Sequence, residues 1–266
     1  RAKRIKDKTW RDITKALTEI QERIQAFANA KNGAFTTERK KINAHLDIIQ
    51  LRSDDGGNIE FIVKKEENKD VSYIMIDGSM SIFYPVLKNT LRKLKIDPEK
   101  IEKIIFTHGD MDHVGSLELA REFNIKVCAH KNFIKTLRSR LPSHPLDHLD
   151  TMLFKVLSDF REPDFEHLRH AFYEENLGQM REFGGMEFFV LDEEEYEGKE
   201  ILVLRGLNGG HTTDSIFVMV VDKNTGKPTD IISGDICIPK GGESLPRGAA
   251  LFIFMLERLS GKVNFN

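Results

Sequence analysis

The stretch Thr107-His108-Gly109-Asp110-Met111-Asp112-His113-Val114-Gly115 decides how the rest of the chain is interpreted. It places two histidines and two aspartates within six residues, after the apolar segment 103–106 and before a helical pattern. Ligands bind at strand ends in α/β sheets because the chain there is exposed but rigidly held. Histidine combined with carboxylate suits zinc, iron or manganese better than calcium or magnesium. The stretch therefore predicts a transition-metal site at the end of a strand.

The flanking segments predict an α/β architecture. Upstream, short apolar segments joined by polar turns are typical of hairpins, and we expect strands at 45–51, 59–63 and 71–76. Around the central stretch, strands and helices alternate, which indicates parallel pairing. The helices are expected at 83–96 and 115–123, and the strands at 103–107 and 126–129. Strands return at 187–191, 201–205, 215–221 and 230–233, followed by a helix at 247–259.

Two segments predict additions to this core. Residues 1–30 carry apolar side chains at helical spacing, so we expect an N-terminal helical extension or linker over 1–43 and the main domain over 44–266. That helix would pack on its own domain, connect to an upstream domain or mediate a homodimer. Residues 132–185 are rich in charge and histidine and show helical stripes without a clear strand. They predict a helical insertion that forms a lid over one end of the sheet.

Composition excludes several classes of protein. The 266 residues include 40 basic and 42 acidic side chains, which gives a formal net charge of −2. Such a balance disfavours a dedicated nucleic-acid binder, although a local basic groove remains compatible with it. The longest apolar run, 248–256, is far shorter than the roughly 20 residues of a membrane-spanning helix. Only two cysteines, Cys128 and Cys237, are present, so a cytoplasmic location is expected.

The stretch 107–115 resembles the signature of metallo-β-lactamase-fold hydrolases, His-x-His-x-Asp-His after a strand, with Asp110 in place of the second histidine. Other elements of that family follow in the family order across residues 45–266. They are the hairpin turn Gly56-Gly57-Asn58, the strand end Ile76-Asp77-Gly78, the segment Gly209-Gly210-His211-Thr212 and the segment Ser233-Gly234-Asp235. The resemblance implies a four-layered αββα sandwich, with metals at one edge between two mixed sheets.

The resemblance also implies a ligand set. One metal would be held by His108, Asp110 and His211, and a second by Asp112 and His113, with Asp235 bridging both. The family usually adds a histidine beyond the bridging aspartate, but no histidine follows His211 here. Either that ligand lies beyond Asn266, so that the domain is cut at its C-terminus, or the second site is weaker and a single ion must be considered.

The function implied by this resemblance is a metal-dependent hydrolase with one or two zinc ions. Bound water, whose pKa falls from about 15.7 to roughly 7 on such an ion, would attack an ester, lactone, thioester or phosphodiester, with Asp112 orienting it. The expected partner is a small-molecule substrate, with no membrane, and the net charge disfavours a nucleic acid; which substrate it is stays open.

The sequence leaves two alternatives open. The carboxylate of Asp110 favours iron or manganese, and iron-containing relatives carry a glutamate at that position. A diiron protein that binds or reduces dioxygen, as a sensor or redox protein, is therefore the main rival. A degenerate, non-catalytic binding module is the third, because of the missing final histidine.

Overall fold

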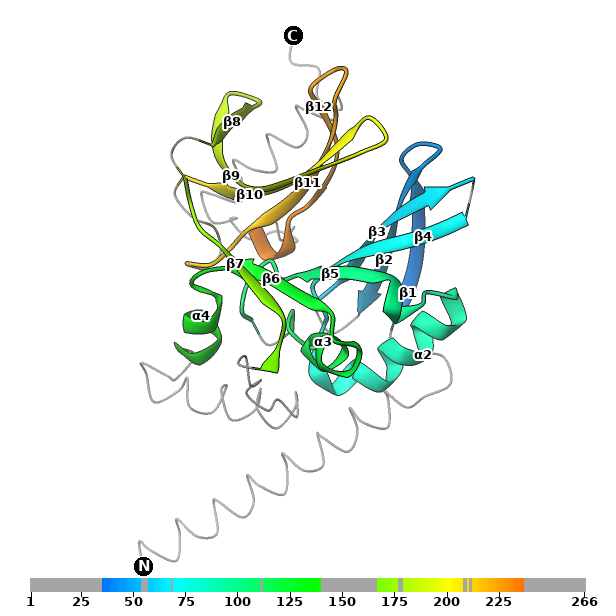
Figure 1. Ribbon diagram of the computed structural model, residues 1–266. Helices are drawn as coiled ribbons and strands as arrows, with labels where there is room; N and C mark the ends of the chain where they lie inside the picture. Colours follow the sequence, from blue (N-terminus) through cyan, green and yellow to red (C-terminus); the bar gives the residue numbers. More distant parts are fainter. Residues whose placement is uncertain are drawn as a thin grey trace, which may run out of the picture.

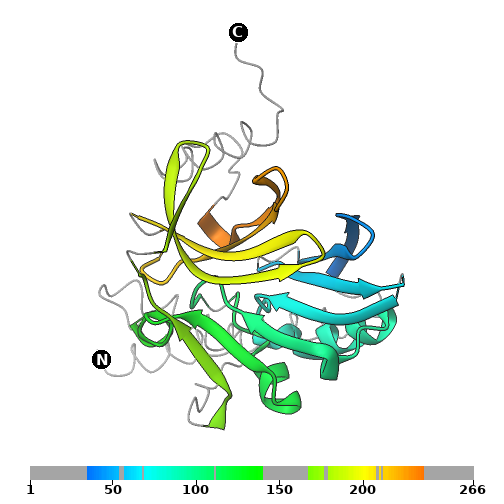
Figure 2. The same ribbon diagram turned by 45° about the horizontal axis from the view of Figure 1, so that its top comes forward.

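The computed structural model describes residues 35–53, 57–67, 69–110, 112–139, 167–176, 179–207, 210 and 212–236. Two β-sheets pack face to face in this part of the chain (Figures 1 and 2). The first sheet has the strand order β1-β2-β3-β4-β5-β6-β7 and the second has the order β12-β11-β10-β9-β8. The strands of the first sheet are β1 (Phe35–Lys41), β2 (Leu46–Ser53), β3 (Ile59–Glu66), β4 (Lys69–Ile76), β5 (Ile101–Ile105), β6 (Lys126–His130) and β7 (His170–Tyr173). Those of the second are β8 (Met180–Phe183), β9 (Met186–Tyr196), β10 (Lys199–Gly206), β11 (Phe217–Asp222) and β12 (Lys227–Ile232).

The first sheet is mixed because its connections change along the chain. Strands β1 to β4 pair antiparallel through short connections, whereas β4, β5, β6 and β7 pair parallel. Parallel neighbours need crossover connections, and two of these are helical. Helix α2 (Tyr84–Leu94) follows the single turn η1 (Ser81–Phe83) and precedes η2 (Pro98–Lys100), while α3 (Leu117–Phe123) joins β5 to β6. The carboxyl ends of β4 and β5 therefore lie at the same edge of the sheet.

Apolar clusters define the layers. Between the sheets, Ile48, Ile62 and Ile74 of the first sheet pack in one cluster with Val203 and Val218 of the second. The opposite face of the first sheet packs against α2 and α3, which lie beneath it in Figure 1. The outer face of the second sheet is also apolar and buried, through Phe188, Leu202, Phe217 and Met219 among others. A sheet that is apolar on both faces is typical of an inner layer, as an α/β sandwich requires.

The predicted strands and the helices α2 and α3 are confirmed, but two segments differ from expectation. Strand β1 lies within residues 1–43, which we expected to be a helical extension or linker. Strands β7 and β8 lie within residues 132–185, where we expected no strand, so that part of the prediction is wrong. Both are four residues long with mixed polarity, and they are held by pairing with β6 and β9 rather than by an apolar pattern. Helix α4 (Phe133–Ser139) opens the same region.

Several predicted elements lie outside the described residues. These are the N-terminal helix at 1–30, the middle of the expected lid at 140–166 and the helix at 247–259. Among the helices that the structure does describe, none has the length and apolar character needed to cross a membrane.

Truncation of the inter-sheet core should measurably destabilise the protein. Ile62 has no exposed surface, and Ile62→Ala should lower the free energy of unfolding by about 2–5 kcal/mol because it leaves a cavity between the sheets. Leu207 is 50% exposed, so Leu207→Ala should change that free energy by less than about 0.5 kcal/mol. Urea unfolding of both variants beside the wild type checks this. Equal effects of the two variants would contradict the packing described here.

Candidate metal centre

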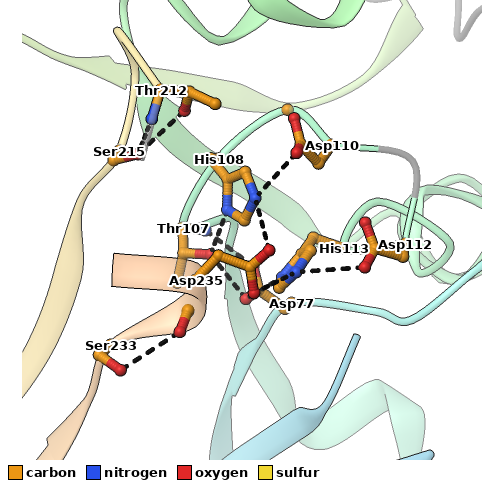
Figure 3. Close-up of polar contacts among 12 residues, drawn as sticks. Asp77, Thr107, His108, Asp110, Asp112, His113, Thr212, Ser215, Ser233 and Asp235 are labelled. Carbon is orange, nitrogen blue, oxygen red and sulfur yellow. Dashed lines mark hydrogen bonds and ion pairs between the residues drawn. The ribbon is translucent and has the colours of Figure 1, made fainter. Parts of the chain in front are cut away.

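Three separate stretches of chain meet at one edge between the two sheets (Figure 3). Asp77 directly follows β4, and the loop with His108, Asp110, Asp112 and His113 follows β5. The third stretch is the single turn η4 (Gly234–Ile236), which carries Asp235 after β12. Residues more than a hundred positions apart are thereby brought together at the ends of three strands.

The imidazole nitrogens and carboxylate oxygens of this site converge. His108 Nε2 lies 3.5 Å from Asp110 Oδ2 and 3.7 Å from Asp235 Oδ2. His113 Nε2 lies 3.2 Å from Asp235 Oδ1 and 3.7 Å from Asp112 Oδ2. The two oxygens of Asp235 thus face one histidine each. Candidate ligand atoms of His108, His113 and Asp235 all lie within 4.8 Å of one another.

This donor set fits divalent transition metals. Two imidazoles and three carboxylates are the ligand types that zinc, iron and manganese take in proteins. Carboxylates at this spacing repel one another, and both histidines are buried, so a cation among them would remove an electrostatic cost. By these distances, Asp110 lies beside His108 and Asp112 lies beside His113, and Asp235 lies between the two pairs.

A buried layer behind the site fixes how the histidines face it. Asp77 Oδ1 accepts a hydrogen bond from the Thr107 backbone N–H, at 2.7 Å, and Asp77 Oδ2 accepts one from the Thr107 hydroxyl. Asp77 Oδ2 also lies 2.8 Å from His113 Nδ1, which must donate to it. The single Thr107 hydroxyl proton is used on Asp77, so His108 Nδ1, 3.0 Å away, donates to the Thr107 oxygen. Both histidines therefore turn Nε2 toward the site, as ligating histidines do.

The titration of His113 reflects the same crowding of carboxylates. Burial by itself would lower the pKa of His113, but the carboxylates of Asp77 and Asp235 outweigh it and raise that pKa well above its ordinary value. Burial also raises the pKa of the Asp112 carboxyl. In the protein without metal, a proton on His113 thus provides part of the positive charge that the neighbouring carboxylates stabilise.

A second loop, 212–216, is held against the loop that bears His108. Buried Asp214 accepts a hydrogen bond from the Gly109 backbone N–H at Oδ2, 2.8 Å away, and one from the Thr212 hydroxyl at Oδ1, 2.6 Å away. The Ile216 N–H donates to the Thr107 carbonyl. Asp214 thus joins the backbone between His108 and Asp110 to the segment that directly follows His211.

Two glycines allow close approach of loops around the site. Gly57 has a φ of +64°, and a Cβ there would lie 1.6 Å from the Asp112 carbonyl oxygen. Gly234 has a φ of +51°, and a Cβ there would lie 2.4 Å from the Thr107 hydroxyl oxygen. The hairpin turn at Gly57 and the turn at Asp235 can therefore approach the central loop only because both positions lack a side chain.

The predicted site residues divide into those the structure places and one it does not. His108, Asp110, Asp112, His113 and Asp235 lie together at the edge between the sheets. His211 lies outside the described residues. Sequence reasoning missed the roles of Thr107 and Asp214, and it assigned no function to Asp77. An aspartate at the end of the strand before the central stretch was the available signal for Asp77; Asp214 had none.

We expect Asp214 to affect metal affinity. Asp214→Asn leaves one acceptor oxygen where the carboxylate accepts hydrogen bonds from two donors, so the loop between His108 and Asp110 should shift. We expect the affinity for Zn²⁺ or Co²⁺ to fall by about 10–100-fold, measured by competition with a chromophoric chelator. Thr90→Val is the control, since it removes a buried hydrogen bond to Val86 in α2, a helix that carries no residue of the site. If Asp214→Asn binds Zn²⁺ or Co²⁺ as tightly as the wild type does, this role of Asp214 is refuted.

Glu60 on β3 should make stability depend on pH. Burial raises the pKa of Glu60 to about 7 from its ordinary 4.5, so the folded protein keeps a proton that the unfolded chain loses between these values. The stability that this proton provides is complete below about pH 4.5 and is lost as the pH rises to about 7. Glu60→Gln removes this dependence, so its stability relative to wild type should rise over that range, by at most about 3 kcal/mol.

Urea unfolding at pH 5, 6, 7 and 8 checks this, with a chelator present so that metal binding adds no pH dependence. The exposed Glu187→Gln is the control for losing one negative charge. A difference between Glu60→Gln and wild type that stays constant with pH would contradict the burial of this carboxyl.

Comparison with known proteins shows what the chain is similar to. A comparison with curated proteins gave no match. Among solved structures, similar chains include the metallo-β-lactamase GOB-18 of Elizabethkingia meningoseptica, 16% identical with a TM-score of 0.48 over 89% of this chain and 77% of that one. Another is BJP-1, a subclass B3 metallo-β-lactamase of Bradyrhizobium japonicum, 13% identical with a TM-score of 0.47 over 87% and 75%. A third is a metallo-β-lactamase with a HARLDQ motif from Cronobacter sakazakii, 13% identical with a TM-score of 0.45 over 87% and 75%.

The decisive comparison is with protein families. The model of the metallo-beta-lactamase superfamily matches residues 67–236, which run from the turn after β3 to the turn that carries Asp235. The matched region contains the loop 107–115 and all the side chains that converge at the edge between the sheets. Since this match covers more than half of the chain, the protein belongs to the metallo-β-lactamase superfamily.

Proposed function

We propose that the protein is a metal-dependent hydrolase that acts on an ester, lactone, thioester or phosphodiester. The observation that supports this most directly is the convergence of His108, Asp110, Asp112, His113 and Asp235 at the edge between the sheets. The proposed cofactor is zinc, one or two ions per chain, and the proposed partner is a small molecule. His211, which directly precedes the loop that Asp214 holds, is proposed as a further ligand of the first ion.

When bound at such a site, a divalent ion lowers the pKa of water to near 7 and polarises the oxygen of a carbonyl or phosphoryl group. The chain's own residues would do the rest. Asp112 lies beside His113 and is partly exposed to the cavity, so its carboxylate would orient the attacking water and accept its proton. Asp77, through His113 Nδ1, would keep His113 Nε2 as the coordinating atom.

A diiron protein that binds or reduces dioxygen is the second candidate, and Asp110 is the observation that favours it. Asp110 Oδ2 faces His108 Nε2 at 3.5 Å, so a hard carboxylate oxygen stands where the family signature has an imidazole. Carboxylate ligands favour iron or manganese relative to an all-histidine set. The metal that the purified protein retains separates the two candidates.

Metal analysis tests the proposed site. The full chain, loaded with a mixture of Zn²⁺, Mn²⁺ and Fe²⁺ under exclusion of oxygen and then freed of excess, should retain one to two ions, counted by mass spectrometry. The double variant Asp112→Ala/His113→Ala should lose most of them. The control variant His170→Ala removes an exposed histidine of β7 that lies outside the site. It should retain as many ions per chain as the wild type. Wild-type protein without metal would refute the proposal.

Activity measurements test the reaction. The zinc-loaded protein should be colourless and should hydrolyse at least one of a p-nitrophenyl ester, a lactone and a bis-p-nitrophenyl phosphodiester. Asp112→Asn should lower kcat by about 10²–10⁴-fold if Asp112 handles the proton. An iron-loaded form with a visible charge-transfer band that responds to oxygen, combined with no hydrolysis, would favour the diiron alternative. Metal binding without either activity would indicate a binding module.

A further inference from the structure

A polar cavity of about 630 Å³ adjoins the candidate metal centre. Its lining includes Asp112, His113 and Asp235 at one end, and residues of β1, β2, β3 and β12 along its walls. Ligand cavities of this size are usually lined mainly by apolar side chains. Here most of the lining residues are charged or polar, with Ile48, Ile231 and Ile232 as the apolar exceptions.

The polar wall is part of the sheet face that elsewhere forms the core. Alternate residues of a strand share a face, so Gln50 points to the same side of β2 as Ile48, which lies in the apolar cluster between the sheets. The register pairs Glu38 with Gln50, Gln50 with Glu60 and Glu60 with Ile76. A row of polar side chains therefore crosses the inner face of the sheet toward the strand end that carries Asp77. Burying polar groups is costly unless they are hydrogen-bonded or solvated, so packing does not account for this row.

Hydrogen bonds link the side chains of this row, from Glu38 and Arg52 to Glu60. Arg52 donates to Glu38 Oε2 at 2.8 Å and to Gln50 Oε1 at 2.6 Å, and Gln50 Nε2 donates to Glu60 Oε1 at 2.9 Å. Because burial raises the pKa of Glu60 to about 7, much of this carboxyl is protonated near neutral pH and can donate as well as accept. The wall therefore offers both donors and acceptors to a molecule in the cavity.

Charges on the wall away from the metal centre are balanced. Lys40 Nζ lies 2.7 Å from Asp230 Oδ2 across the two sheets, and Arg52 is paired with Glu38. An anion bound at Lys40 or Arg52 would lie beside the carboxylate of Asp230 or Glu38, and a cation bound at these carboxylates would lie beside a basic side chain. Neither sign of charge is favoured, whereas an uncharged molecule that forms many hydrogen bonds disturbs neither pair.

We propose that this groove holds the part of the substrate beyond the bond that is cleaved, and that this part is an uncharged group rich in hydroxyls or amides, such as a sugar ring or a peptide amide. The inference rests on the proposed hydrolytic function, because it takes the candidate metal centre as the reacting end of the groove. Gln50 is assigned as a specificity-determining residue, since its amide lies midway along the hydrogen-bonded row.

Thiols that anchor on a metal can test the groove without a known substrate. The full chain is loaded with Co²⁺, whose thiolate charge-transfer band reports binding, and is titrated with 1-thio-β-D-glucose and with cyclohexanethiol. The two thiols present a similar ring to the groove, with and without hydroxyls. They differ in thiol acidity, so the decisive quantity is how the ratio of their dissociation constants changes in Gln50→Leu. We expect this variant to shift the ratio by about tenfold toward cyclohexanethiol, the effect of losing one or two hydrogen bonds.

Gln179→Leu, the same change in the exposed turn before β8, is the matched control and should leave the ratio as in wild type. An unchanged ratio in Gln50→Leu, with cobalt bound and thermal unfolding as in wild type, would overturn the inference and leave the proposed function standing. Failure of wild-type protein to bind cobalt would refute the proposed function and the inference together.

Mercaptosuccinate is the third ligand, because Lys40 and Arg52 could instead mark a site for anions. If Lys40→Met weakens mercaptosuccinate binding tenfold or more while the ratio for the two neutral thiols is unaffected by Gln50→Leu, the groove recognises anions and the inference is wrong.

Discussion

The buried carboxylate of Asp77 is the interaction on which the site depends. One oxygen accepts a hydrogen bond from the Thr107 backbone, and the other contacts both the Thr107 hydroxyl and His113. Asp77 ends one strand and Thr107 follows its parallel neighbour, so this carboxylate joins two strand ends and sets the direction of both histidines. The parallel pairing of β4 and β5, imposed by the crossover through α2, is thus a precondition for the chemistry proposed at the edge.

Local sequence patterns predict those strands and loops whose own side chains distinguish them. The apolar strands are predicted by their runs of apolar residues, and the loop 107–115 is predicted by its two histidines and two aspartates. Strands β1, β7 and β8 could not be identified in this way: β1 is largely exposed and polar, and the other two are short. Their pairing is fixed by backbone hydrogen bonds to neighbours that only the folded chain provides. The contact of Asp214 with Gly109 spans 105 residues, and no local pattern indicates it.

The first sheet illustrates how one surface can serve stability and recognition together. Along its inner face, isoleucines fill the space between the sheets, and the change to Gln50 and Glu60 occurs where the face opens into the cavity. The same strands therefore hold the sandwich together and line the groove beside the metal centre. A substitution in the isoleucine part acts through stability, whereas one in the polar part can alter binding while the core stays packed.

The number of carboxylates around the site bears on how many ions it would take. Asp110, Asp112 and Asp235 converge with the two histidines, and Asp77 lies directly behind His113. When ionised, these four carboxylates carry four negative charges. One divalent ion would leave two of them uncompensated at a largely buried site, which is unfavourable, whereas two divalent ions balance all four. Asp110 contributes one of these four negative charges. The carboxylate of Asp110 therefore adds to the negative charge that a second ion would balance in the proposed site, and as an anionic ligand it would weaken the ion beside His108 as a Lewis acid.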